Sequence, residues 1–231
     1  DIASALVIFE TFLNMVTAWG DTSSTPLELM LQSAARLLFR HTHSGPFRPA
    51  LLRDHLTKSL KLFPRNTIFI SLYSWNESRL RIDDRVRTIL RSTILTNDND
   101  NIISRLFAIR YEMRAGNVHS TIAAFENAVS SPLCGSNPGL WRYYIFFCAN
   151  SKEQRHKAKD IFLRSIRACP WAKDLMMMAF TEVEGLEAED KIAIYKVLVE
   201  KELRIRVDVE HRIEEWYDRN RMRPGKGLQQ L

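Results

Sequence analysis

The sequence contains groups of residues that could bind a metal ion, and none of them has a complete set of ligands. His41 and His43 lie two positions apart, but no third imidazole, carboxylate or thiolate accompanies them, as a zinc site requires. We expect them in a polar loop between helices. The run of asparagine and aspartate at 97–101 lacks the glycine and the terminal glutamate of a calcium loop. We expect these side chains to cap a helix that begins near Ile102.

Catalytic motifs are missing in the same way. We interpret the carboxylates around Gly185 as residues of the first turn of a helix, where they interact favourably with the helix dipole, rather than as an acid–base pair. Residues 224–227 read PGKG and lack the strand and the first glycine of a phosphate-binding loop, so we expect 221–231 to form a flexible tail. The sequence has no G-x-S-x-G, H-E-x-x-H or G-x-G-x-x-G pattern. We therefore predict that the chain is not an enzyme and needs no metal or other cofactor.

The three cysteines, Cys134, Cys148 and Cys169, give no sign of a redox or metal site. They have neither C-x-x-C spacing nor a histidine partner, and the last two lie in apolar helical contexts. We predict buried free thiols in a reducing compartment.

The composition is that of a soluble globular chain. Hydrophobic residues make up 45% of the 231 positions and charged residues 26%, and the longest unbroken apolar run, 143–149, is too short to span a membrane. The net charge of +6 and the isoelectric point near 9.3 permit RNA or an acidic peptide as a partner without requiring either. Since the chain begins at Asp1 with no initiator methionine and no basic leader, we expect a piece of a longer protein.

The elements that must position any site are helices. Glycine and proline fall between stretches with apolar residues at helical spacing, such as Gly116 at an expected helix end and Pro138 at an expected helix start. Thr25 and Glu28 fit a capping box at another helix start. No convincing strand is found. About twelve helices are predicted, over residues 2–19, 26–40, 49–62, 66–80, 83–95, 101–115, 118–130, 138–149, 152–168, 171–184, 187–203 and 208–220.

The predicted helices form a repeat of 33 to 37 residues. In the second helix of each pair a large apolar residue is followed three positions later by a small one, in the columns Leu56, Ile89, Phe125, Phe162 and Ser59, Ser92, Ala128, Ser165. A proline ends three of the units, and the first helices carry aromatic residues such as Trp75. We predict an all-α solenoid of antiparallel helix pairs, forming a single domain over residues 1–231. The alternative is chance periodicity in a globular helical bundle.

The repeat resembles the half-a-TPR (HAT) repeat of RNA-processing proteins more than a tetratricopeptide. The HAT pattern has an aromatic first helix and a second helix of the form A-x-x-I-F-x-R-A-I-x-x-x-P. Residues 158–170, AKDIFLRSIRACP, fit it closely with Ser165 in the small position. Residues 124–132 fit it with Asn127 in place of the usual basic residue.

Two further blocks, 164–180 and 200–208, resemble the C-terminal end of the NRDE family, which is named for nuclear RNA interference. The resemblance implies a nuclear, non-enzymatic scaffold in RNA processing and silencing, including splicing and exosome-linked RNA surveillance. In that family the usual associates are splicing factors, coiled-coil adaptor proteins and an Mtr4-like exosome helicase. The segment that engages the helicase is expected upstream of this chain.

The basic C-terminal segment holds most of the residues that we expect at a partner surface. Arginine alternates with apolar residues over 203–207 and aromatic residues follow, but carboxylates are interleaved with them. Pairing within the chain, contact with a protein, and contact with single-stranded RNA through guanidinium groups and rings all stay open. The predicted protein-binding or capping residues are Trp171, Arg204, Arg206, Trp216 and Tyr217. The leading hypothesis is a scaffold that binds a partner helix or peptide on its repeat surface; the alternative is a single-stranded RNA-binding module, and a homodimer is also open.

Overall fold

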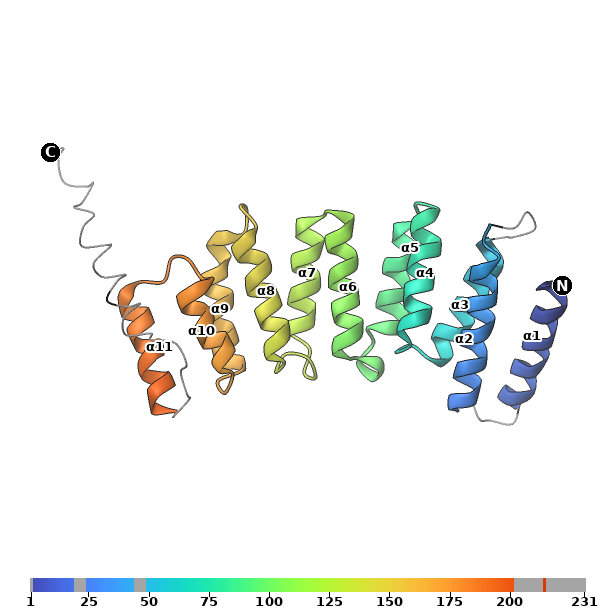
Figure 1. Ribbon diagram of the computed structural model, residues 1–231, viewed down its shortest axis with the longest axis horizontal. Helices are drawn as coiled ribbons and strands as arrows, with labels where there is room; N and C mark the ends of the chain where they lie inside the picture. Colours follow the sequence, from blue (N-terminus) through green and yellow to red (C-terminus); the bar gives the residue numbers. More distant parts are fainter. Residues whose placement is uncertain (1, 19–23, 44–48, 202–213, 215–231) are drawn as a thin grey trace. The chain divides into compact units, whose positions relative to one another are not determined.

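The computed structural model describes residues 2–18, 24–43, 49–201 and 214, and over these ranges the chain contains eleven α-helices and no strand (Figure 1). The helices are α1 (Ile2–Ala18), α2 (Thr25–Arg40), α3 (Pro49–Leu62), α4 (Thr67–Arg79), α5 (Asp83–Ile89), α6 (Ile102–Ala115), α7 (Val118–Val129), α8 (Pro138–Asn150), α9 (Ala158–Ala168), α10 (Lys173–Thr181) and α11 (Ala188–Glu200). Three short helical segments accompany them: the π-helix η1 (Leu90–Ile94) and the 3-10 helices η2 (Asn97–Asn99) and η3 (Arg155–Lys157).

The observed helices follow the predicted ones closely, with differences at their ends. The helix predicted over 152–168 begins later, since turns and η3 occupy its first six positions. The predicted helix at 208–220 and the predicted tail at 221–231 lie outside the described ranges. Asn101 caps α6 as expected, because its side-chain oxygen accepts a hydrogen bond from the Ser104 amide at 2.9 Å.

The predicted capping box at the start of α2 is wrong. The N-cap is Ser24, so Thr25 already lies inside the helix, and no side-chain cap bond is made there. The carboxylate of Glu28 instead accepts a hydrogen bond from the side-chain amide of Asn66 at 2.6 Å. Asn66 is itself the N-cap of α4 and accepts bonds from the Ile68 and Phe69 amides. Glu28 therefore links two first helices of successive pairs rather than closing its own.

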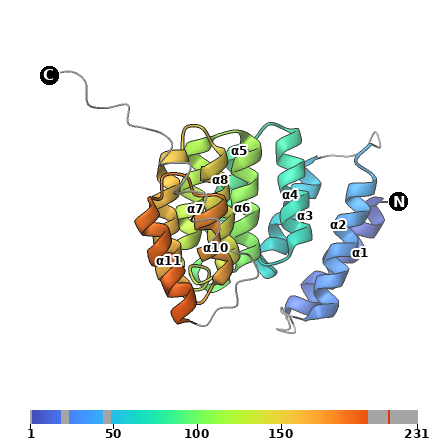
Figure 2. The ribbon, with the colours of Figure 1, turned by 60° about the vertical axis from the view of Figure 1, so that its left-hand side comes forward.

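Contacts within the chain group the helices into two units, residues 1–124 and 125–231, with the boundary inside α7. In the first unit α1, α2, α3, α4 and α5 pack in order along the chain, and in the second α8, α9, α10 and α11 do the same (Figure 1, Figure 2). The first helices of the predicted pairs are α2, α4, α6, α8 and α10. The predicted all-α solenoid of antiparallel helix pairs is confirmed; the extent of a single domain over 1–231 stays a prediction.

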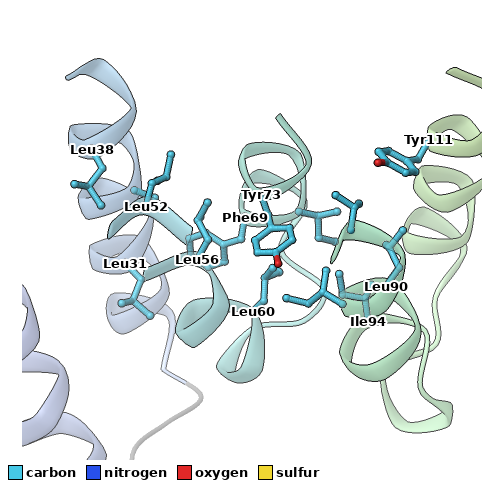
Figure 3. Packing of buried hydrophobic residues seen from close by; sticks show 14 of the residues in the cluster. Leu31, Leu38, Leu52, Leu56, Leu60, Phe69, Tyr73, Leu90, Ile94 and Tyr111 are labelled. Carbon is cyan, nitrogen blue, oxygen red and sulfur yellow. The ribbon is translucent and has the colours of Figure 1, made fainter. Parts of the chain in front are cut away.

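Leucine and aromatic side chains fill the space between the pairs of the first unit. Leu31 and Leu38 of α2 belong to one cluster with Leu52, Leu56 and Leu60 of α3, and all five are almost completely buried (Figure 3). The other labelled members of this cluster are Phe69, Tyr73, Leu90, Ile94 and Tyr111. Burial of this size supplies the main favourable term in folding of the unit.

The predicted large-residue column is confirmed, and the small-residue column is confirmed at three of its four positions. Leu56, Ile89, Phe125 and Phe162 are all buried, as are Ser59, Ala128 and Ser165. Ser92 is exposed instead. It lies within η1, where a π-helical turn changes the register, so that Leu90 and Ile94 face the core and Ser92 faces out.

All three cysteines are free and buried, as predicted. Burial raises the pKa of the Cys148 thiol to about 11 and also raises that of Cys169. Both side chains therefore act as small apolar packing residues at neutral pH.

Candidate partner-binding surfaces

Of the five predicted surface residues, only Trp171 lies in the described part of the chain. It precedes α10 and is 59% exposed, next to Pro170, whose carbonyl accepts a hydrogen bond from the Lys201 ammonium at 2.5 Å. Arg204, Arg206, Trp216 and Tyr217 lie outside the described ranges. The exposure of Trp171 leaves it accessible to a partner, and the role of all five residues stays a prediction.

The first unit contains a groove between α4 and α6, the first helices of two successive pairs. We call it the α4–α6 groove; it encloses about 420 Å³ and is lined by Ser71, Ser74, Trp75, Ser78, Arg79, Phe107 and Arg114. The lining thus combines two aromatic rings, two guanidinium groups and three hydroxyl groups, without a carboxylate. From the sequence, Trp75 is expected only as an aromatic residue of the repeat. In the structure it lines this groove.

Trp75 is held in place by two neighbours and is still 37% exposed. The ring of Phe39, from α2, meets the indole edge-on with 4.9 Å between ring centroids. The guanidinium of Arg79, one turn further along α4, lies over the indole at 5.5 Å from its centroid. A rigid and partly exposed aromatic side chain of this kind is a typical anchor in protein interfaces.

The two arginines of the groove differ from Arg53 and Arg87 of the second helices in having no carboxylate partner among the described residues. Arg53 of α3 pairs with Glu77 of α4 at 2.6 Å, and Arg87 of α5 binds both carboxylate oxygens of Glu112 of α6. By contrast, among the described residues no carboxylate pairs with Arg79 or Arg114, although both are exposed. The positive charges of Arg79 and Arg114 are therefore accessible to solvent and to a partner.

The paired arginines were missed by sequence analysis, although a signal for them exists. Arg53 and Arg87, on two second helices, each reach a glutamate in the following first helix, at separations of 24 and 25 residues. Tyr111 adds a bond of the same kind, since its hydroxyl donates to Asp83 at 2.5 Å. Burial and this bond raise the pKa of Tyr111. These contacts join α4 to α3 and α6 to α5.

The second unit contains a corresponding groove between α8 and α10. We call it the α8–α10 groove; it encloses about 270 Å³ and is lined by Arg142, Phe146, Asp174, Met177, Met178, Thr181 and Glu182. Phe146 is 51% exposed and lies eight positions after Pro138, as Trp75 lies eight positions after Thr67. The same place in two first helices therefore presents an exposed aromatic ring.

The three consecutive methionines divide between core and groove. Met176 and Met178 are buried and Met177 is half-buried, and both Met177 and Met178 line the α8–α10 groove. A flexible thioether beside Phe146 suits an adaptable apolar contact.

Glu126 joins α7 to α8 and α9 in the second unit. Its carboxylate accepts two hydrogen bonds from Arg164 and one from the Tyr144 hydroxyl, each at 2.8 Å. The bonds from Arg164 hold the pKa of Glu126 below its usual range. Arg164 also lies over the Trp141 ring, and Tyr144 stacks on Phe125 with centroids 4.6 Å apart. Arg164 is the basic residue of the HAT-like segment, and this network gives that position a structural role.

Within the described ranges, no group of three or more histidine, cysteine, aspartate or glutamate residues could hold a metal ion. Also within them, no helix has both the length and the apolar character needed to cross a membrane. What the structure offers is a helical-repeat surface with grooves between successive first helices.

The sequence is similar to three curated proteins that carry the name nuclear exosome regulator NRDE2. It is 30% identical to the mouse protein over 215 residues, which cover 82% of this chain and 18% of the relative. It is 28% identical to the human protein over 216 residues, covering 83% of this chain and 18% of the relative. It is 26% identical to the Dictyostelium discoideum protein over 171 residues, covering 69% and 13%. No family model matches the chain, and no solved structure matches it significantly.

These similarities extend over most of the described helices. Over the described residues the fold is an all-α solenoid with grooves between successive first helices. The relatives support the assignment of the chain to the NRDE family, in agreement with the resemblance of its C-terminal blocks. The relatives are named as nuclear proteins, in agreement with the nuclear location expected for this chain. The chain spans 18% of the length of the mouse and human relatives.

Proposed function

We propose that the chain is a non-enzymatic protein-binding scaffold in a nuclear RNA-regulatory complex connected with the exosome. The connection with the exosome comes from the name of the relatives. Because this chain corresponds to a small part of those proteins, it would supply one binding platform within a larger regulator.

The observation that carries the proposal is the recurrence of an exposed aromatic ring in two grooves. Trp75 and Phe146 occupy the same place in α4 and α8, and each lines a groove shared with the next first helix. A repeat array leaves such grooves open along its length, and an amphipathic helix or an extended peptide can lie in them. Exposed aromatic anchors provide much of the binding free energy in complexes of this kind.

The partners that fit this proposal are a peptide or helix of a splicing factor or of a coiled-coil adaptor protein. Trp171, Arg204, Arg206, Trp216 and Tyr217 would form a further contact or capping surface. An Mtr4-like helicase would bind through the region upstream of this chain. A homodimer formed through the repeats would compete for the same faces.

Single-stranded RNA is the second candidate ligand, and one observation favours it. The C-terminal segment carries Arg204 and Arg206 with Trp216 and Tyr217, and guanidinium groups and aromatic rings are the groups that bind phosphates and bases. RNA binding would weaken steeply as the salt concentration rises.

The test is capture of partners from nuclear extract, with and without ribonuclease, followed by mass spectrometry. We expect partners that survive ribonuclease and that are lost when Trp75→Ala and Phe146→Ala are combined, because the substitutions remove both anchors. The matched control combines Ile103→Ala and Leu133→Ala, which change exposed apolar residues of the two units outside the grooves. Partners that disappear with ribonuclease would instead make RNA the ligand.

A further inference from the structure

The α4–α6 groove is chemically different at its two ends. Ser71, Ser74 and Ser78 are three or four positions apart, so their hydroxyl groups share one face of α4 with Trp75. Arg79 and Arg114 stand in the last turns of α4 and α6. Figure 1 shows that both helices end at the same edge of the unit, so these last turns form one end of the groove. The aromatic rings of Trp75 and Phe107 line the groove between that end and Ser71.

We propose that the α4–α6 groove binds an acidic segment of a protein partner. An apolar side chain of the segment would pack on Trp75 and Phe107, and an Asp or Glu carboxylate would lie between Arg79 and Arg114. This inference rests on the proposed function, because it names the chemistry of the partner at one of the two grooves.

Charge complementarity is the first argument for an acidic segment. The groove is lined by two guanidinium groups and no carboxylate. By contrast, Arg53 and Arg87 of the second helices already bind glutamates. A carboxylate accepts hydrogen bonds from guanidinium in a geometry that neutral groups do not match. The hydroxyl groups of the three serines can both donate to and accept from the backbone of a bound segment.

The same lining argues against single-stranded RNA at this groove. An RNA strand needs a series of cations that follow its phosphates, and the lining residues include only Arg79 and Arg114 as cations. A single carboxylate between the two guanidinium groups needs no further cation.

Stabilisation of the helix ends by their own arginines is a separate effect that must be controlled. Basic residues in a last turn interact favourably with the helix dipole wherever the helix lies. Arg91 provides the matched control, because it is an exposed arginine in the last turn of η1 and does not line the groove. Arg91→Glu therefore tests the helix-end effect without the groove.

The experiment is a selection of random linear peptides displayed on phage, carried out in parallel on three forms of the whole 231-residue chain. The forms are the unchanged chain, the double variant Arg79→Glu with Arg114→Glu, and the Arg91→Glu control. We expect the unchanged chain and the control to enrich peptides in which Asp or Glu accompanies Leu, Phe or Trp. We expect the double variant to lose these peptides, and the affinity of the best synthetic peptide to fall by about tenfold or more.

Each result decides the inference. Enrichment of neutral or basic peptides, or equal binding of the acidic peptide to the double variant, would overturn it. So would binding of an oligouridine probe that depends on Arg79 and Arg114 when no acidic peptide is enriched. If the acidic peptide binds the double variant as well as the unchanged chain, while ribonuclease-resistant nuclear partners are lost on combining Trp75→Ala and Phe146→Ala, the inference fails and the proposed scaffold function stands. Thermal unfolding of each variant checks the fold, and Arg79→Gln with Arg114→Gln replaces a double variant that does not fold.

Discussion

Glu126 shows how one side chain can join several helices of the repeat. Its carboxylate receives bonds from α8 through Tyr144 and from α9 through Arg164, while it stands on α7 itself. Arg164 in turn covers Trp141, so a single charged pair also fixes an aromatic ring. Because the pair is partly exposed, its contribution to stability comes mainly from this geometry rather than from strong electrostatics.

We predict that Glu126→Gln lowers the free energy of unfolding by roughly 1 kcal/mol at neutral pH. The pKa of Glu126 is lower in the folded state than in the unfolded state, so the charged pair contributes fully above the unfolded pKa. That contribution is lost as the pH falls through the folded pKa. Urea unfolding of both forms at about pH 7 and about pH 3 measures it. A difference between the two forms that does not shrink at the lower pH would contradict the role given to Glu126.

Single residues also mark where prediction from the sequence stopped. The buried thiols and the apolar columns were predictable, because burial of these residue types at helical spacing is the usual outcome. The exposure of Trp75 was not, since the same spacing fits an aromatic residue that fills the core. Only the positions of Phe39 and Arg79 around the indole distinguish the two.

At the scale of the elements, the helix ends depend on short-range signals that the sequence displays clearly. Asn66, Asn101 and Asn137 each accept a bond from an amide of the first turn. Gly116 ends α6 in the left-handed region, with φ of 76°. Signals that involve distant partners were harder to predict, and Glu28, which binds Asn66 rather than its own helix, is the example.

The left-handed conformation of Gly116 gives a prediction for α6. Nothing lies within 4 Å of the place where a Cβ atom would be added, so only backbone strain opposes a side chain there. Gly116→Ala should lower the free energy of unfolding by roughly 1–2 kcal/mol. Gly116→Asn should cost less, because asparagine tolerates this region better. Denaturant unfolding compares the three forms, and an Ala variant as stable as the original chain would contradict this account of the helix end.

The π-helical turn η1 marks the limit of repeat periodicity as a guide. The sequence columns assume one register through the second helix, and five residues of π-helix shift it. Ile94 is consequently buried and Ser92 exposed, opposite to what the small-residue column implies. No pattern in the local sequence distinguishes this turn from ordinary α-helix.

At the scale of the whole chain, repetition explains why the fold was predictable and the grooves were not. Helix length, turn residues and apolar spacing are properties of the sequence within each repeat, and they indicate a solenoid. A groove arises from two helices about one repeat apart, and its chemistry depends on which arginines already have partners. The paired Arg53 and Arg87 and the accessible Arg79 and Arg114 are alike in the sequence.

The central claim is that the chain binds protein directly along the first helices of its pairs. Site-specific photo-crosslinking tests it most directly, with p-benzoylphenylalanine in place of Trp75, and in place of Arg91 as the control on a second helix. In nuclear extract, the claim predicts protein adducts from position 75 that persist after ribonuclease and are absent from position 91. Adducts from position 75 to RNA alone, or the same adducts from both positions, would contradict it.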